Sequence, residues 1–312
     1  MRIIFTGSGD FGIPTLAALL EARQEIAMVC TRPDRPAGRG RKLTSTAIAR
    51  FAAEHTLPLI RTADINVEHL PPADLMIVIA FGQKIAPAVV DRPRLGSVNL
   101  HASLLPKFRG AAPINWAILR GETRTGNSII RLAQKMDAGD ILAQSPLPIA
   151  ELETAGELHD RLAGDGARLM VRTIQDLQAG RVAEIAQDES RATPAPKLSR
   201  QSAVIDWRSP AVEISRKIRG LYPWPGCRIR LLDAGGVERA RLTLVRARAA
   251  EGEGLRGRPG EITSDGSVAC ADGAIDLVEI QPDDRRSMAL SDYRRGNPWT
   301  PGMKFESIGP PP

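Results

Sequence analysis

Short apolar runs alternate with helix-like segments through the N-terminal half of the chain, and this alternation restricts the fold more than any other feature. The apolar runs cover residues 2–6, 25–31, 74–81 and 97–101. The helix-like segments cover residues 14–23, 46–55 and 84–90. Buried strands that alternate with helices form parallel sheets, because the helices supply the crossover connections. The pattern therefore predicts an α/β fold with a doubly wound, mostly parallel sheet.

A further pair of strands and a long helix follow in the sequence. The strands are expected at residues 127–133 and 140–149, and residues 157–180 have the apolar spacing of an amphipathic helix that ends at Gly180. Residues 187–201 are polar, contain two prolines and lack apolar periodicity. A segment with that composition is typical of a linker between domains.

The C-terminal region has a different pattern, in which short β-type runs dominate. After a helix-like segment at residues 211–222, these runs cover residues 227–232, 241–249, 267–271 and 274–280. Such runs, separated by turns rich in glycine or aspartate, indicate a small β barrel or sandwich. We therefore expect an α/β domain at residues 1–188, a linker at 189–203 and a smaller β-barrel domain at 204–312.

The composition is that of an ordinary globular protein. The chain has 312 residues, of which 43% are hydrophobic and 25% are charged. No apolar run approaches the roughly 18 residues that a membrane span requires, and no signal peptide precedes the first strand, so we expect a cytoplasmic protein without membrane contact. The three cysteines form no C-x-x-C pair, which predicts neither a disulfide framework nor a metal site. The net charge of +6 is compatible with a polyanionic partner.

A G-x-G-x-x-G pattern at residues 7–12 follows the first predicted strand, with Asp34 downstream. The pattern suits a dinucleotide such as NAD, for which Asp34 would contact the ribose. Glycines are also what a tight strand-to-helix turn requires, and Asp34 lies among cations rather than at a clean strand end. We therefore interpret these glycines as scaffold and expect no NAD.

A basic loop at residues 31–43 follows the second predicted strand. Its cations are Arg32, Arg35, Arg39, Arg41 and Lys42. Two glycines and two prolines are expected to prevent regular structure there, and a loop at the carboxyl end of a strand lies where α/β domains bind ligands. Although a solvated charged loop would explain the pattern as well, the density of arginine beside glycine favours contact with an RNA backbone.

Two polar residues stand two positions apart at the end of an apolar strand. Side chains at positions i and i+2 of a strand share a face, so Asn99 and His101 project together while Leu100 points to the opposite face. A histidine of this kind needs a carboxylate to orient it. Asp137 is the favoured partner because Ala-Gly follows it in a turn, and Asp140 is the competing choice.

This trio suits acyl transfer to an amine without a protein nucleophile. The Asn99 amide and a protonated His101 would stabilise an oxyanion, and Asp137 would hold His101 and help to move the amine proton through water. Neither a G-x-S-x-G motif nor a cysteine of catalytic type accompanies them, which disfavours covalent catalysis.

The segment from Asn99 to Ile114, NLHASLLPKFRGAAPI, is similar to the signature of the folate-dependent formyltransferases. The resemblance extends over nearly the whole chain. It includes the segments 8–12, 31–43, 80–85, 136–142, 197–207 and 218–226. The sequence departs from the family pattern at Ser8-Gly9, where a Thr-Pro step is common, and at Ala102, where glycine is frequent. Neither change touches the proposed trio, but beyond Gly226 the match is loose.

The resemblance implies a Rossmann-like catalytic domain and an OB-like barrel, with 10-formyltetrahydrofolate as the formyl-donating cosubstrate. It assigns catalysis to Asn99, His101 and Asp137. The implied folate-binding residues are Phe81, Gly82, Gln83, Lys84, Ile85, Ser103, Leu104, Leu105 and Pro106. Backbone groups of the first five typically read the pterin, and the last four form the turn beside it.

Within the family, the basic loop and the C-terminal region select the branch that formylates the methionine amine of initiator tRNA. The implied tRNA contacts are the five cations of the loop together with Lys197 and Arg200. We expect a monomer. The alternatives are an amino-sugar nucleotide N-formyltransferase, which has no evident use for the basic loop, an RNA-binding module with a degenerate enzyme domain, and the NAD-dependent oxidoreductase already considered.

Overall fold

The computed structural model describes residues 1–37, 40, 42–250 and 257–309. Its contacts divide the chain into two compact units that interleave in sequence. Unit 1 comprises Met1–Gly110, Thr125–Leu147 and His159–Ala195, and unit 2 comprises Ala111–Arg124, Pro148–Leu158 and Pro196–Pro312. The predicted combination of an α/β sheet with a smaller β-barrel-like domain is confirmed. No helix in these ranges is both long and apolar enough to cross a bilayer.

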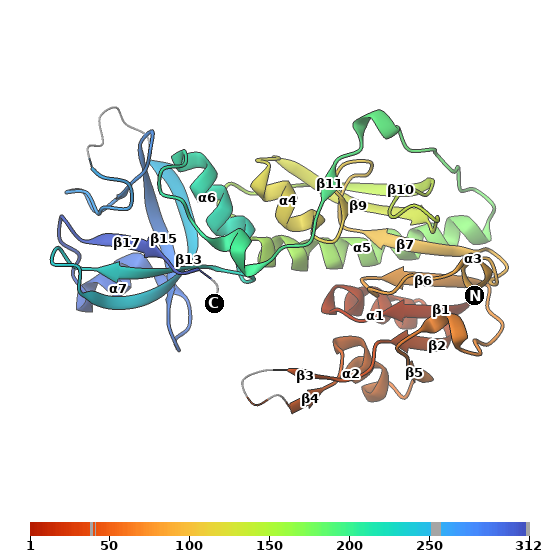
Figure 1. The fold of residues 1–312 in the computed structure, drawn as a ribbon. Helices are drawn as coiled ribbons and strands as arrows, with labels where there is room; N and C mark the ends of the chain where they lie inside the picture. The colour runs from red at the N-terminus through yellow and green to blue at the C-terminus, as the bar shows by residue number, and fades with distance from the viewer. Residues whose placement is uncertain (38–39, 41, 251–256, 310–312) are drawn as a thin grey trace. The chain divides into compact units, whose positions relative to one another are not determined.

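Unit 1 is built on a seven-stranded sheet in the order β10-β9-β7-β6-β1-β2-β5. The strands are β1 (Arg2–Gly7), β2 (Glu25–Thr31), β5 (Leu59–Arg61), β6 (Leu75–Ile79), β7 (Ser97–His101), β9 (Arg124–Arg131) and β10 (Ile141–Pro148). Strands β1, β2, β5, β6 and β7 run parallel to one another, whereas β9 pairs with β7 in antiparallel fashion. Figure 1 shows the sheet, in which the strand order reverses between β1 and β6.

Helices and short elements complete unit 1. They are η1 (Asp10–Gly12), α1 (Ile13–Glu21), α2 (Ala47–Glu54), η2 (Ile65–Val67), α3 (Pro87–Val90), α5 (Ala155–Gln178, in unit 1 from His159 onward) and η3 (Glu189–Arg191), with the strand pairs β3 (Arg35–Ala37) and β4 (Lys42–Thr44), and β8 (Arg109–Gly110) and β11 (Pro194–Ala195). Gly166 of α5 packs so closely on Leu100 that a Cβ there would lie 2.7 Å from Leu100 Cδ2. Since side chains alternate along a strand, Asn99 and His101 lie on the face of β7 opposite α5.

The glycine at the end of β1 is required by close packing. A Cβ on Gly7 would lie 2.8 Å from the carbonyl oxygen of Ile79, which is closer than real Cβ atoms approach. A Cβ on Gly12 would press on Phe5, Ile48 and Ile79 at 3.2–3.6 Å. The contact between β1, β6 and the helical layer therefore accounts for these glycines, in line with their interpretation as scaffold.

The expectation that the basic loop lacks regular structure is wrong. Residues 35–37 and 42–44 form a short antiparallel pair in which Pro36 faces Leu43. A proline fits such a pair because a two-stranded ribbon consists only of edge strands, where a missing N–H costs no interior hydrogen bond. The tip residues Gly38, Arg39 and Arg41 lie outside the described residues.

Unit 2 contains a bent antiparallel sheet with the order β14-β15-β13-β12-β17, and β16 pairs with β15. Its elements are α4 (Pro113–Leu119), η4 (Arg200–Ala203), α6 (Ala211–Gly220), β12 (Cys227–Leu232), β13 (Glu238–Ala250), β14 (Val268–Ala269), β15 (Ala274–Pro282), β16 (Met288–Ala289), α7 (Leu290–Gly296) and β17 (Lys304–Ser307). Isolated bridges from Glu261 to Lys304 and from Ile262 to Val268 nearly close the sheet into a barrel. Bulges in β13 bend the strand enough for this closure.

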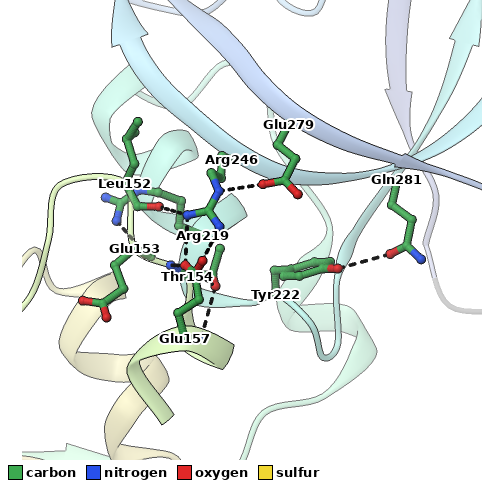
Figure 2. A network of polar contacts seen from close by, with 9 residues as sticks. All are labelled: Leu152, Glu153, Thr154, Glu157, Arg219, Tyr222, Arg246, Glu279 and Gln281. Atoms are coloured by element: carbon green, nitrogen blue, oxygen red, sulfur yellow. Dashed lines mark hydrogen bonds and ion pairs between the residues drawn. The ribbon is translucent and has the colours of Figure 1, made fainter. Parts of the chain in front are cut away.

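An arginine-centred network joins residues 152–157 to the barrel within unit 2 (Figure 2). Arg246 of β13 donates to Glu279 of β15 at 2.6 Å and to the Leu152 carbonyl at 2.7 Å, and both oxygens of Glu157 accept from it. The Glu157 carboxylate also accepts from the backbone N–H of Thr154. Hydrogen bonds from Arg246 hold the pKa of Glu157 at about 2, well below its ordinary value of 4.5.

This network generates a prediction about acid stability. The lowered pKa means that Glu157 stabilises the fold above its ordinary pKa of 4.5, and that this stabilisation is lost as the pH falls toward about 2. We expect Glu157→Gln to lower the free energy of unfolding at pH 7 by about 1 kcal/mol or less, because the side chain is half exposed. Urea denaturation between pH 2 and pH 7 measures the effect. The curve of the variant should be flatter between about pH 2 and 4.5, and the exposed Glu213→Gln serves as control; parallel curves would contradict the prediction.

Candidate active site

The carboxyl ends of five parallel strands lie at one edge of the unit 1 sheet, and the predicted site residues follow these ends. Phe81 and Gly82 come after β6, His101 ends β7, and the basic loop begins after β2. The strand order reverses between β1 and β6, and such a switch point is where open α/β sheets typically bind ligands.

Both ring nitrogens of the buried His101 face oxygen atoms. Nε2 lies 2.9 Å from the carbonyl oxygen of Phe108, and Nδ1 lies 3.6 Å from Oδ2 of Asp137. A carbonyl can only accept, so Nε2 donates its proton to the Phe108 carbonyl, while Nδ1 faces the Asp137 carboxylate. At 3.6 Å, Nδ1 and Oδ2 are too far apart for a hydrogen bond, which leaves Nδ1 able to contact a substrate oxygen.

Backbone contacts hold Asp137 in place, both from Gly110 and within its own turn between β9 and β10. It lies between β9 and β10 with φ of +53°, in the left-handed region that costs a non-glycine residue energy. The amide of Gly110 donates to Asp137 Oδ2 at 2.8 Å, which directs this oxygen toward His101. A Cβ on Gly139 would lie 1.9 Å from the Arg131 carbonyl, so the turn needs glycine there. The structure brings Asp137 to His101, and the backbone carbonyl of Asp140 instead accepts from Arg131.

Asn99 precedes His101 on the same face of β7. Its backbone pairs with Val78 of β6 and Ile130 of β9, so it occupies an interior strand. The side chain is half-buried, whereas His101 is 6% exposed. The amide of Asn99 and the ring of His101 therefore share one surface, as their spacing predicts.

The segment after β6 presents backbone rather than reactive side chains. Phe81 is buried, and Gly82 is exposed with φ of +74°. The Gln83 carboxamide accepts from the Ile65 amide at 3.0 Å and donates to the Thr62 carbonyl at 2.8 Å. Its side chain therefore braces the segment. The bare backbone at Gly82 fits the expected role of a wall for a flat ring.

Lys84 and Ile85 continue this wall. Lys84 is exposed, and its carbonyl accepts from the side chain of Asn66 at 3.0 Å. Ile85 packs against the apolar cluster beneath the sheet. The predicted helix at residues 84–90 is shorter than expected, because α3 spans only Pro87–Val90. The residues before it are consequently irregular, which leaves backbone groups for other partners.

Hydrogen bonds with serine hydroxyl groups hold the turn at residues 103–106 in place. Ser128 donates to the Ser103 carbonyl at 2.6 Å and accepts from the Leu105 amide at 3.0 Å. Ser103 itself donates to the Lys107 carbonyl at 2.6 Å. Leu104 packs over Gly126, where a Cβ would lie 2.6 Å from Leu104 Cδ2, and the Leu105–Pro106 peptide is cis. These residues therefore contribute a shaped surface rather than free polar groups.

The predicted RNA-contacting cations divide between the two units. Arg35 and Lys42 are exposed on the β3–β4 pair of unit 1, and Lys197 and Arg200 are exposed in unit 2. Arg32 differs from them, because it is half-buried with its guanidinium 3.3 Å from the position of a Cβ on Gly82. The buried Arg32 Nε has no hydrogen-bond partner among the described residues.

The three cysteines are buried. Burial raises the pKa of Cys30, Cys227 and Cys270 to about 12 in each case. A thiol with such a pKa is almost entirely protonated at neutral pH, so none of the three is an activated nucleophile. This agrees with the prediction that the chemistry proceeds without a cysteine adduct.

Sequence reasoning missed four residues that surround the pair. Phe108 supplies the carbonyl to His101, Gly110 the amide to Asp137, and Gln187 and Arg109 form hydrogen bonds next to them. Phe108, Arg109 and Gly110 stand in the segment that carries the family resemblance. Gln187 stands in a polar stretch without apolar periodicity, so no sequence pattern marked it as a site residue.

Two family models match the two parts of the chain. Residues 1–174 match the formyl transferase family, and residues 197–298 match the C-terminal domain of formyl transferases. Methionyl-tRNA formyltransferase of Moorella thermoacetica is 41% identical over 97% of this chain and 98% of its own length. That of Pseudomonas paraeruginosa is 41% identical over 94% of both chains.

The chain belongs to the methionyl-tRNA formyltransferases. Solved structures of related enzymes support the fold at lower identity. An N-formyltransferase from Helicobacter canadensis, in complex with folinic acid and dTDP-3-aminofucose, has a TM-score of 0.65 at 16% identity, with 92% of this chain and all of that chain covered. HypX from Aquifex aeolicus, in complex with tetrahydrofolic acid, has a TM-score of 0.60 at 19% identity, covering 99% of this chain and 51% of that chain.

Proposed function

We propose that the chain transfers the formyl group of 10-formyltetrahydrofolate to the amine of methionyl initiator tRNA. The observation that carries this function is the convergence of Asn99, His101 and Asp137 at the carboxyl edge of the sheet, in a chain of this family. The product is N-formylmethionyl-tRNA, which serves translation initiation. The amino-sugar alternative is weaker, because the solved sugar N-formyltransferases share under a fifth of their residues with this chain.

Asn99 and His101 stabilise the negative charge that develops on the formyl oxygen. As the amine nitrogen bonds to the formyl carbon, the carbonyl oxygen becomes an oxyanion of a tetrahedral intermediate. The Asn99 side-chain N–H and the Nδ1 proton of His101 share the face of β7 on which that oxygen would lie. Preorganised donors in a buried site are worth more than donors in water.

Asp137 orients His101 and moves a proton. Its carboxylate faces Nδ1 of the ring at 3.6 Å. The amine must lose a proton when the new carbon–nitrogen bond forms, and the folate nitrogen must gain one when its bond to the formyl carbon breaks. Asp137 assists this transfer through water, and no covalent adduct with the protein forms.

The folate cosubstrate binds along residues 81–85 and the turn 103–106. Gly82 offers exposed backbone to the ring, and the braced turn supplies an apolar wall. Arg32 adds a buried N–H beside Gly82 that a ligand oxygen can satisfy. These positions bind and orient the donor and exclude water from the formyl group.

The tRNA contacts the exposed cations of both units. Arg35 and Lys42 lie on the paired strands β3 and β4 of the basic loop, which is called the basic hairpin from here on, and Lys197 and Arg200 lie in the segment that opens the C-terminal part of the chain. We assign catalysis to residues 1–188 and binding of the tRNA body to residues 204–312, joined by 189–203. We further propose that the chain acts as a monomer in the cytoplasm.

The catalytic assignment predicts a loss of rate without a loss of binding. His101→Ala and Asp137→Asn are expected to lower kcat for formyl transfer by about 10²–10⁴-fold, because they remove charge stabilisation and proton transfer. Affinity for tRNA should change by less than about threefold, since phosphate contacts provide most of it. Single-turnover formylation and filter binding measure the two quantities. Full activity of either variant would contradict the assignment, and a wild-type chain that binds tRNA but transfers no formyl group would favour an RNA-binding module.

The acceptor is predicted to be charged initiator tRNA. With 10-formyltetrahydrofolate as donor, kcat/KM should exceed that for an amino-sugar nucleotide by at least about 10³-fold, because the basic hairpin contributes binding only to a polyanion. Radiolabelled formyl transfer to each acceptor, with His101→Ala as the background control, makes the comparison. Activity confined to the sugar would overturn the proposed function.

The basic hairpin is predicted to contact phosphates. Replacing Arg39, Arg41 and Lys42 by glutamine should weaken tRNA binding and reduce the slope of log K against log salt by about one for each lost phosphate contact. Replacement of Arg2, Arg92 and Arg94, which lie beside the amino ends of the strands, removes equal charge and serves as control. An unchanged slope in the hairpin variant would assign these cations to solvent.

A further inference from the structure

We propose that residues 187–195, called the strap from here on, position the His101–Asp137 pair, and that Gln187 is the positioning residue that fixes the Asp137 turn. The inference rests on the proposed function, because it concerns the same pair. The strap is the last segment of unit 1 before the chain enters unit 2. Sequence patterns describe most of it as a linker, yet it forms hydrogen bonds to the segments that hold both members of the pair.

Gln187 clamps the backbone around Asp137. Its Nε2 donates to the Asp137 carbonyl at 2.8 Å and to the Gly139 carbonyl at 2.7 Å. Both N–H groups of the Gln187 carboxamide therefore donate to the turn that carries the catalytic carboxylate. Because Asp137 has a left-handed φ of +53°, its conformation persists only where neighbouring contacts enforce it. The two bonds supply that enforcement.

The other end of the Gln187 carboxamide faces a guanidinium. Oε1 accepts from Arg109 Nε at 3.1 Å and from Arg109 Nη2 at 2.7 Å. A guanidinium can only donate and a carbonyl can only accept, so the orientation of the amide follows from its partners. Gln187 therefore links the Asp137 turn to Arg109, which is the residue between Phe108 and Gly110.

Charge strengthens this link. Arg109 also pairs with Glu189 of the strap at 2.7 Å, and Lys135 binds the same carboxylate. Hydrogen bonds from Arg109 and then Lys135 hold the pKa of Glu189 at about 2, so the carboxylate stays charged at neutral pH. The Arg109 side chain is only 10% exposed. The guanidinium is consequently fixed in place for its bonds to Gln187.

The far end of the strap holds the segment that contacts His101. Thr193 Oγ1 accepts from the Phe108 amide at 2.9 Å, and the Arg109 amide donates to the Thr193 carbonyl at 2.8 Å. Phe108 has a φ of +62°, and its own carbonyl accepts from His101. A Cβ on Gly110 would lie 2.5 Å from the Ala195 carbonyl, so the pairing of β8 with β11 requires glycine at that position.

Core packing does not explain the strap. Apart from the buried Ala195 and the half-buried Gln187 and Ala192, its residues are exposed. Its hydrogen bonds instead converge on Asp137, Phe108 and Arg109. A segment that adds little apolar burial but fixes two left-handed residues beside a catalytic pair acts by orienting that pair, and small displacements of reacting groups cost rate.

The first test uses two substitutions with different effects on the clamp. Gln187→Ala removes all four bonds, whereas Gln187→Glu keeps the acceptor for Arg109 and loses the donors to the Asp137 and Gly139 carbonyls. Both variants are expected to lower kcat by about 10–100-fold, with KM for either substrate changed by less than about threefold. Gln175→Ala, at an exposed position on α5, is the matched control and should keep the wild-type rate. If Gln187→Ala unfolds at the assay temperature, Gln187→Glu carries the test.

The second test asks whether Gln187 acts through Asp137. In an Asp137→Asn background, Gln187→Ala should reduce kcat by less than about twofold further, because the positioned carboxylate is already absent. Independent, multiplying losses would overturn the positioning role, as would a wild-type kcat for both Gln187 variants while Asp137→Asn is impaired. Wild-type activity of Asp137→Asn would instead overturn the proposed function itself.

Discussion

The shared direction of β1, β2, β6 and β7 is the constraint on which the rest of unit 1 depends. Parallel strands place all their carboxyl ends at one edge, so segments that are far apart in sequence meet there. Close packing maintains the edge, since Gly7 leaves no room for a side chain against Ile79. The strand order reverses next to β1, at the kind of switch point where open α/β sheets typically bind ligands.

Burial of His101 makes its hydrogen-bond partners decisive. His101 is 6% exposed and has few contacts with water, so the Phe108 carbonyl and the Asp137 carboxylate largely fix the orientation of its ring. Both partners lie in segments with left-handed residues, which are not intrinsically favoured. The orientation of the histidine ring therefore depends on backbone geometry in loops, and those loops depend on the contacts that the strap makes.

The two units are each assembled from separate stretches of chain. Residues 148–158 belong to unit 2 because Arg246 binds Glu157 and the Leu152 carbonyl. Residues 111–124 join it as well, since Trp116 and Leu119 of α4 pack on the barrel core. Periodicity could not reveal this interleaving, because it reports which residues are apolar and not which apolar surface they contact.

The sequence by itself determined the strands and helices that have strong apolar periodicity, and the polar residues that stand at the ends of these strands. Alternation in β7 placed Asn99 and His101 on one face, and α5 and most strands of both sheets followed from apolar spacing, whereas the short strands β5, β16 and β17 did not. Tertiary structure decided everything that depends on loops. It selected Asp137 over Asp140, paired β3 with β4, and turned part of an expected linker into the strap. The physical reason is that strand and helix periods are local properties of the chain, whereas the partners of Gln187, Phe108 and Gly110 lie tens of residues away and are set only when the loops pack together.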